Sequence, residues 1–304
     1  MNAMKGSALA WGAVVSAGVL WGGAALVAQR LIEGGLSPWS LALARFALGL
    51  PLLWWWHLRA EAGTSTRWRD LSPRQRALML GTGVAMALNV SCWFQGIAHL
   101  GAALPTVISI CCAPVLVALV SVLRGYEPVS RQLLGALALA LVGVGCVVAP
   151  ADGWQLAPGH AAGLAWSFAS AALYAAVVLC NARMPASVSA VTASTWGMTA
   201  AAGCMAAIAG VQGVTWPADG LAWLGVGYTG VVTTSVAYLA FAWGPRRLSP
   251  TAAVVGTLIE PLVAALLAWV LWAEPMLPRQ WLGALLLGAA MGLLARRART
   301  SIAT

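Results

Sequence analysis

Two ionisable side chains, Arg45 and Glu260, lie inside long apolar stretches of the sequence. If these stretches cross a membrane, their charges are costly at the bilayer centre, where ionisable groups usually serve a function. Glu260 comes about eleven residues into its stretch, roughly 16 Å along a helix and therefore near the midplane. Its carboxylate could bind a ligand ammonium, take up a proton, or form a structural ion pair with Arg45, and the sequence leaves these roles open.

Aromatic and amide side chains form a second group of candidates deep within apolar stretches. Indole and phenol rings offer broad apolar faces and single hydrogen-bond donors, which suits a pocket for a small amphipathic molecule. Asn89 and Trp93 are four residues apart and so share one helix face. For the aromatic side chains, packing alone is the alternative to lining a pocket. The hydroxyls of Thr106, Ser109, Thr233 and Ser235 could likewise bond to their own helices. The expected binding residues are Trp21, Asn89, Trp93, Gln95, Trp166, Tyr174, Tyr238 and Glu260.

Other residue types exclude several kinds of chemistry. The six cysteines contain no Cys-x-x-Cys pair, and the three histidines stand near the ends of apolar stretches, so we expect no metal and no cofactor. Lys5 is the one lysine, which excludes the Gly-Lys-[Ser/Thr] ending of a phosphate-binding loop. Neither paired intramembrane aspartates nor a His-Glu-x-x-His helix is present, so we expect no enzyme.

The composition is that of a polytopic membrane protein. Of the 304 residues, 61% are hydrophobic and 8% charged, and the mean hydropathy is +0.84. A helix needs about 20 apolar residues to cross about 30 Å of hydrocarbon. On this basis the sequence predicts ten transmembrane helices, at 8–31, 37–58, 75–98, 102–123, 132–149, 159–181, 188–210, 219–243, 249–272 and 279–296.

The basic residues predict the orientation of these spans. An excess of Lys and Arg marks cytoplasmic loops. With a cytoplasmic N-terminus, all of the 17 basic residues except Arg30, Arg45 and Arg279 fall on the cytoplasmic side. The net charge of +9 therefore reflects orientation in a cytoplasmic (inner) membrane, with both termini inside, and we expect no nucleic-acid partner.

The two halves of the sequence repeat each other. The segment Ala113-Pro114-Val115-Leu116, followed by Glu127-Pro128 and Arg131-Gln132-x-x-Gly135-Ala136, recurs as Glu260-Pro261-Leu262-Val263, Glu274-Pro275 and Arg279-Gln280-x-x-Gly283-Ala284. Because each half holds five spans, an odd number, the second copy enters the membrane in the opposite sense. We expect one repeat over 1–150 and the other over 151–304.

Small residues predict close packing of two of these helices. Ala284-x-x-x-Gly288-x-x-x-Gly292 in the last span and Ala136-x-x-x-Ala140 in the fifth have the spacing that lets membrane helices approach closely. The contact could join two chains, but one chain already supplies both halves. We therefore expect an intramolecular contact and a monomer.

Further motifs carry a resemblance to a known family. Leu20-Trp21-Gly22-Gly23, Gly35-Leu36-Ser37-Pro38 and Leu43-Ala44-Arg45-Phe46, with the two repeated blocks, resemble the drug/metabolite transporter superfamily, EamA type. The resemblance implies an all-α membrane fold of ten helices in two inverted five-helix repeats. It also implies a central cavity, lined mainly by spans 1, 3, 4, 6, 8 and 9, that exports amino acids, amines or other small metabolites by alternating access.

The tryptophan-rich interior is most similar to the aromatic amino-acid exporters of that superfamily. Export of drugs or other metabolites by proton antiport is the alternative, and a channel or an intramembrane enzyme is a more distant one. The expected partners are a small-molecule substrate and the lipid bilayer.

Overall fold

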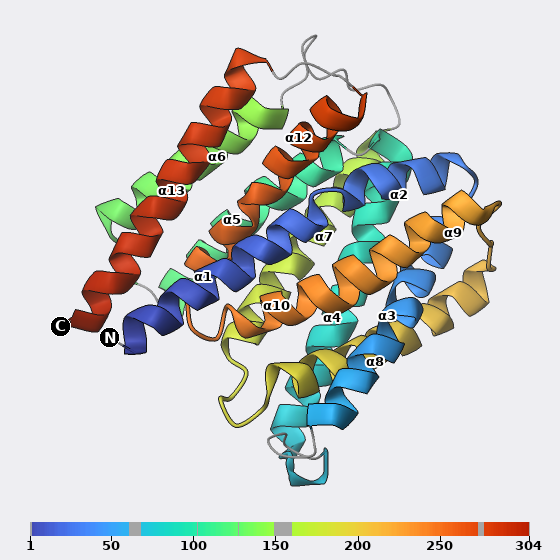
Figure 1. Ribbon diagram of the computed structural model, residues 1–304, viewed down its shortest axis with the longest axis horizontal. Helices are drawn as coiled ribbons and strands as arrows, with labels where there is room; N and C mark the ends of the chain where they lie inside the picture. Colours follow the sequence, from blue (N-terminus) through green and yellow to red (C-terminus); the bar gives the residue numbers. More distant parts are fainter. Residues whose placement is uncertain are drawn as a thin grey trace.

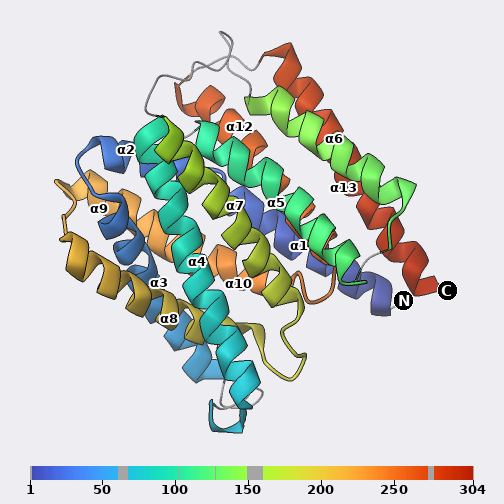
Figure 2. The ribbon, with the colours of Figure 1, turned by 180° about the vertical axis from the view of Figure 1, so that it is seen from behind.

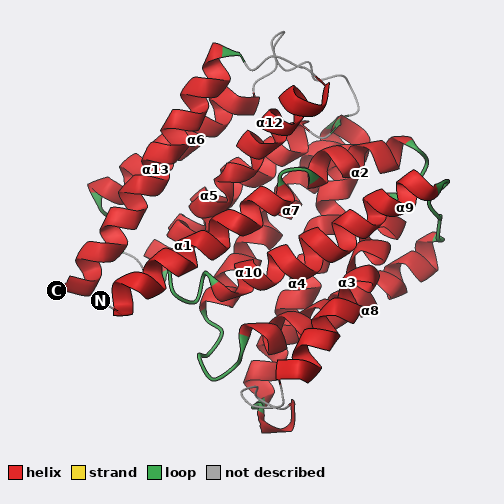
Figure 3. Ribbon diagram, viewed as in Figure 1, coloured by secondary structure: helices red, strands yellow, loops and turns green. Residues whose placement is uncertain are grey.

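The computed structural model describes residues 2–60, 68–101, 103–126, 128–148, 160–272 and 277–303, and these ranges contain helices and no strands (Figure 3). Six helices are long and apolar enough to cross a membrane, and two shorter apolar helices accompany them. The chain is therefore a multi-pass helical membrane protein, as the composition predicts.

The helices follow the predicted spans closely. Seven spans are single helices, and the first, eighth and ninth are each built from two or three consecutive pieces. In chain order the elements are α1 (Asn2–Trp21), α2 (Ala24–Glu33), α3 (Pro38–Ala60), η1 (Trp68–Asp70), α4 (Pro73–Leu100), α5 (Ala103–Leu123), α6 (Arg131–Val148), α7 (Ala161–Ala182), α8 (Ala190–Gln212), α9 (Gly220–Gly227), η2 (Tyr228–Val236), α10 (Ala237–Trp243), α11 (Pro250–Gly256), η3 (Thr257–Ile259), α12 (Glu260–Trp272) and α13 (Pro278–Ala303).

Local signals explain where several helices begin. Ser72 caps α4 by accepting a hydrogen bond from the Gln75 amide, and the Gln75 side chain accepts one from the Ser72 amide. This reciprocal pair satisfies amides that have no partner within the helix. Ser189 and Ser249 cap α8 and α11 by accepting a hydrogen bond from a backbone amide three residues on, so serines fix the start of three spans.

The helix pairings show the inverted repeat. The second span (α3) packs on the seventh (α8), and the fifth (α6) packs on the tenth (α13), as Figures 1 and 2 show. The third span (α4) packs on the sixth (α7), and its counterpart in the second half, the eighth (α10), packs on the first (α1). The contact between the third and sixth spans thus has its equivalent in the contact between the eighth and first spans, as a twofold axis between two inverted five-helix repeats requires.

Contacts between the connections sort them to the two ends of the bundle. At one end Gln75 donates to Ser187, Arg246 donates to the Val188 carbonyl, and the Arg183 guanidinium lies over the Tyr126 ring. These contacts bring together connections that are predicted to lie in the cytoplasm. At the other end the Ser37 amide donates to Thr215. The grouping of the loops agrees with the predicted topology, while the assignment of the first end to the cytoplasm stays a prediction.

The α6–α13 contact differs from the one predicted. A Cβ atom on Gly143 would lie 3.0 Å from the Gly283 carbonyl oxygen, so the helices approach closely there. Gly288 and Gly292 are exposed, with open space where a Cβ would be, so the prediction that they pack within the chain is wrong. Helical rotation places Gly283, Leu287, Ala290 and Leu294 toward the bundle instead.

Some predictions fall outside the described residues. The repeat boundary at 150/151 lies in the undescribed range 149–159. Glu127 and Glu274-Pro275 of the repeated motifs are also outside the described residues. The division into 1–150 and 151–304 therefore stays a prediction.

Candidate functional site

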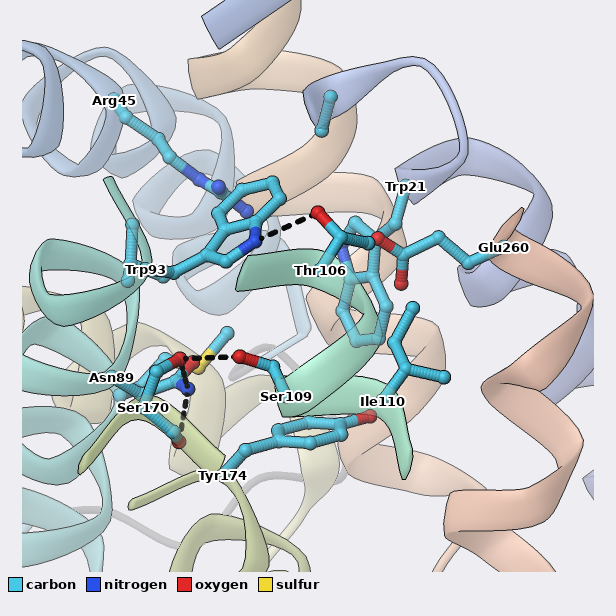
Figure 4. A pocket seen from close by; sticks show the side chains of 13 residues that line it. Trp21, Arg45, Asn89, Trp93, Thr106, Ser109, Ile110, Ser170, Tyr174 and Glu260 are labelled. Carbon is cyan, nitrogen blue, oxygen red and sulfur yellow. Dashed lines mark hydrogen bonds between the residues drawn. The ribbon is translucent and has the colours of Figure 1, made fainter. Parts of the chain in front are cut away.

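A cavity of about 80 Å³ lies at the centre of the bundle, between spans of both repeats. Figure 4 shows its lining from close by. The side chains come from α1 and α2, α3, α4, α5, α7 and α12. They are Trp21, Ala24, Arg45, Met86, Asn89, Val90, Trp93, Thr106, Ser109, Ile110, Ser170, Tyr174 and Glu260.

Glu260 enters the cavity from the start of α12, directly after the 3-10 turn η3. The sequence predicts a free Thr257 carbonyl, because Pro261 has no amide proton to donate to it. That prediction is wrong, since the tighter turn lets the Glu260 amide donate to the Thr257 carbonyl instead. Within the described part of the chain, the Glu260 carboxylate itself has no hydrogen bond and no ion pair, so it is left facing the cavity.

Arg45 enters from α3 and is 3% exposed. Its Nε donates to the Thr234 hydroxyl at 2.8 Å. No ion pair joins Arg45 to Glu260 in the ranges that the structure describes, although both line the same cavity. In Figure 4 the two side chains reach the site from different elements, with aromatic rings drawn between them. The cavity therefore holds one group of each charge, and neither neutralises the other by direct contact.

Three irregular backbone segments lie next to residues that line the cavity or accept hydrogen bonds from them. They are the break at Gly22-Gly23 between α1 and α2, the π-helical segment η2, and the 3-10 turn η3. Irregular backbone at membrane depth requires protein partners for its polar groups.

Aromatic side chains contact all three segments, and two of them bond to backbone carbonyls. The Trp21 indole donates to the Thr233 carbonyl in η2 at 2.8 Å, and the Tyr228 hydroxyl donates to the Leu20 carbonyl at 2.7 Å. The Tyr174 hydroxyl and the Thr257 hydroxyl in η3 are 3.1 Å apart. These bonds link each irregular segment to another span.

The opposite wall is made of continuous helices joined by polar side chains. The Asn89 amide donates to the Ser170 carbonyl at 2.8 Å and to its hydroxyl at 3.0 Å. Ser109 donates to the Ser170 hydroxyl at 3.2 Å, and Trp93 donates to Thr106 at 3.1 Å. Figure 4 shows these bonds as dashed lines between α4, α5 and α7. They hold the wall in one arrangement and leave few donors free.

The structure brings Trp21, Asn89, Trp93, Tyr174 and Glu260 together around the cavity, out of the predicted binding residues. Their roles in binding stay predictions.

Gln95, Trp166 and Tyr238 do not line the cavity. Gln95 is two residues from Trp93 and so points to another face of α4. Trp166 packs edge-on against Trp39, with ring centroids 6.2 Å apart. Tyr238 is 2% exposed, accepts a hydrogen bond from Asn181, and packs on Phe241 in the core.

Several lining residues were not singled out from the sequence. Ser170 and Met86 are the main ones, and Ile110 is another. A signal was available, because Ser170 is four residues before Tyr174 and Met86 is three before Asn89, so each pair shares a helix face.

Comparisons with known proteins agree with the fold. A solved structure described only as the crystal structure of a protein is 19% identical to this chain, with a TM-score of 0.73. The match covers 95% of this chain and 98% of the other. A search of curated proteins finds no significant match. The EamA-like transporter family matches twice, over residues 8–149 and 161–296. Two matches in tandem, on ten spans that pair as two inverted five-helix repeats, show that the chain belongs to the EamA-like transporter family.

Proposed function

We propose that this membrane transporter exports small zwitterionic metabolites, most directly aromatic and neutral amino acids, across the cytoplasmic membrane by alternating access. The observation that carries the proposal is the pair of opposite charges, Arg45 and Glu260, which line one cavity without an ion pair between them. An amino acid carries an ammonium and a carboxylate on neighbouring atoms. The Glu260 carboxylate suits the first and the Arg45 guanidinium suits the second.

Desolvation supports a zwitterion over a singly charged cargo. Both side chains are held in a membrane interior where an uncompensated charge is costly. A zwitterion between them would compensate both at once, whereas an amine or an acid would compensate only one. The net charge of the filled site would then equal that of the empty site.

The aromatic lining supports a planar apolar side chain on the cargo. Trp21, Trp93 and Tyr174 border the cavity, and the indole of each tryptophan is already bonded within the protein. The rings therefore offer apolar faces rather than free donors, which favours aromatic or aliphatic amino acids over polar ones.

The size of the cavity supports alternating access. About 80 Å³ is well below the roughly 300–1,000 Å³ of typical small-molecule pockets. Cargo binding therefore requires the surrounding helices to move apart. Inverted repeats provide for this, because either end of the bundle can open around a fixed central site.

Counterflow in proteoliposomes tests the charge assignment. Labelled tryptophan is the cargo, and the competitors are tryptamine, which lacks the carboxylate, and indole-3-propionate, which lacks the ammonium. We expect each analogue to compete at least about tenfold more weakly than unlabelled tryptophan, since each forfeits one charge-assisted contact. If both analogues competed as strongly as unlabelled tryptophan in the wild type, the proposal would be contradicted.

Two variants assign the charges to residues. Glu260→Gln should lose the discrimination against indole-3-propionate, and Arg45→Gln the discrimination against tryptamine. Glu33→Gln is the matched control, because Glu33 is exposed on α2 and accepts a bond from Gln29. If Arg45→Gln does not fold, the Glu260→Gln result still decides whether the ammonium is read at that residue.

Proton antiport of drugs or other metabolites is the second candidate, and the unpaired Glu260 carboxylate favours it because such a group can carry a proton through the cycle. In that case an imposed pH gradient should drive cargo against its own gradient in the wild type and not in Glu260→Gln. Facilitated movement of amino acids predicts no such driving. Neither candidate requires an enzyme activity, a cofactor or a second chain.

A further inference from the structure

A second cavity of about 730 Å³ lies between the spans at the end of the bundle where Arg246 is found. Its walls come from the start of α8 and the connection before it, from the end of η2 and α10, and from single residues of α1 and α3. We call it the α8–α10 groove. Most of its lining is apolar, including Val188, Val191, Leu239 and Trp243. It does not share a lining residue with the central cavity.

Two arginines form the polar end of the α8–α10 groove. The Arg246 Nη1 donates to the Val188 carbonyl, while its Nε and Nη2 are buried without a hydrogen-bond partner. The Arg247 guanidinium lies over the Trp243 ring, 4.0 Å from the ring centroid. No acidic side chain is among the residues that line the groove. Burial and the adjacent Arg247 lower the pKa of Arg246 to about 10, so the Arg246 guanidinium remains cationic at neutral pH.

Buried donors of a cation that have no hydrogen-bond partner strongly favour binding of an anionic acceptor. Leaving a buried charged donor unsatisfied is costly, and an oxyanion with several acceptor atoms could satisfy both nitrogens of Arg246. The partial positive charge at the N-terminal end of α8, which also borders the groove, acts in the same direction.

The apolar wall of the α8–α10 groove indicates that the ligand also has an apolar part. Val236 is 38% exposed on a membrane-spanning segment, so the groove is open to the lipid on that side. A free phosphate or a small acid would leave the long apolar wall uncovered. A lipid chain would cover it, since apolar area removed from water or from a poorly packed void favours binding.

We infer that the α8–α10 groove is a binding site for an anionic phospholipid. The phosphate contacts Arg246 and Arg247, and one acyl chain lies along the apolar wall between α8 and α10. Basic pockets between membrane helices commonly hold such headgroups. Because η2 and α10 form one wall, a bound lipid braces the eighth span near the segment that contacts Trp21 and Arg45.

Native mass spectrometry of the purified full chain in neutral detergent tests the inference. The probes are phosphatidylglycerol, phosphatidylcholine and glycerol phosphate, which carries the headgroup chemistry without acyl chains. We expect one tightly retained phosphatidylglycerol on the wild type and none of the other two at the same concentration. Arg246→Gln should bind phosphatidylglycerol about tenfold more weakly, because it loses a charge-assisted contact.

Two further variants keep the test decisive if Arg246→Gln does not fold. Ala240→Phe fills the apolar part of the groove without changing a charge, and it should also weaken phosphatidylglycerol binding. Arg131→Gln is the matched control, because Arg131 is exposed at the start of α6 and does not line the groove. It should bind as the wild type does.

Several outcomes would overturn the inference. Equal phosphatidylglycerol retention by the wild type and Ala240→Phe would show that the groove does not hold the acyl chain. Equal binding of glycerol phosphate and phosphatidylglycerol would make the occupant a soluble phosphate. Displacement of phosphatidylglycerol by a transported amino acid would make the groove a cargo route.

Discussion

The hydrogen bond from Tyr228 to the Leu20 carbonyl joins the eighth span to the break in the first. In an unbroken helix the Leu20 carbonyl would accept from the Ala24 amide. Here the chain breaks at Gly22-Gly23, and the Tyr228 hydroxyl donates to Leu20 at 2.7 Å. Tyr228→Phe removes the hydroxyl and leaves the ring, so it tests this one bond.

The size of the effect follows from burial of the carbonyl. A buried carbonyl without a partner costs about 1–3 kcal/mol, and the half-buried ring of Tyr228 places the effect at the lower end, about 1–1.5 kcal/mol. A difference of about 1.4 kcal/mol is tenfold in an equilibrium constant. Local opening of the α1–α2 break should therefore become about tenfold more frequent.

Hydrogen exchange measured by mass spectrometry checks this expectation. Amides of residues 20–27 should exchange about tenfold faster in Tyr228→Phe, since exchange reports local opening. Tyr126→Phe is the matched control, because Tyr126 is exposed on the connection after α5 and its ring contacts Arg183. Unchanged exchange at 20–27 in Tyr228→Phe would refute the idea that this bond holds the break closed.

Two further substitutions test the packing of the bundle and its polar wall. Gly83→Ala should destabilise the protein by about 1–3 kcal/mol, because the added Cβ would lie 1.9 Å from the Gly197 carbonyl oxygen, whereas Gly81→Ala on the same helix meets open space and should be neutral or stabilising in thermal melting. Asn89→Leu should reduce tryptophan counterflow and lower the melting temperature, since it leaves both Ser170 acceptors without the Asn89 donor. Equal melting temperatures for the two glycine variants, or wild-type counterflow in Asn89→Leu, would contradict the respective argument.

The limits of the spans could be predicted because they depend on hydropathy and length alone. A membrane helix must satisfy its backbone internally, so long apolar runs bounded by Arg, Pro and Gly leave few alternatives. The inverted arrangement followed from the repeated motifs and the odd number of spans in each half. Both arguments use information that is local in sequence, or repeated in it.

Regular helices explain only part of the outcome, because Gln95 on α4 and Trp166 on α7 do not line the cavity, whereas Trp21 and Glu260, beside irregular segments, do. Asn89 and Trp93 on α4, and Tyr174 on α7, line the cavity. They could be predicted because residue spacing shows which side chains share a face of a regular helix. Tyr238 follows the π-helical segment η2, where the wider turn shifts the register of the next residues, and it lies in the core instead.

The irregular segments themselves could not be predicted, because distant partners stabilise them. The Trp21 indole bonds a carbonyl of η2 that is 212 residues away, and Arg45 bonds Thr234 in the same segment from 189 residues away. No local pattern encodes a partner at such a distance. The same is true of the free Glu260 carboxylate, since whether Arg45 reached it depended on where η2 placed Thr234.

The twofold axis pairs each span that contains an irregular segment with a continuous helix. The first, eighth and ninth spans contain the Gly22-Gly23 break, η2 and η3, whereas their counterparts α7, α4 and α5 are continuous, even through Pro114. The two repeats therefore share an architecture but differ in their backbone. Helices without such interruptions move as rigid bodies, and a broken span can bend at its break. An exporter whose two gates were equivalent would need matching breaks in both repeats. Since the described residues show such breaks in the first, eighth and ninth spans alone, we expect the bending that admits and releases cargo to occur there, against a wall that Asn89, Ser109 and Ser170 hold together.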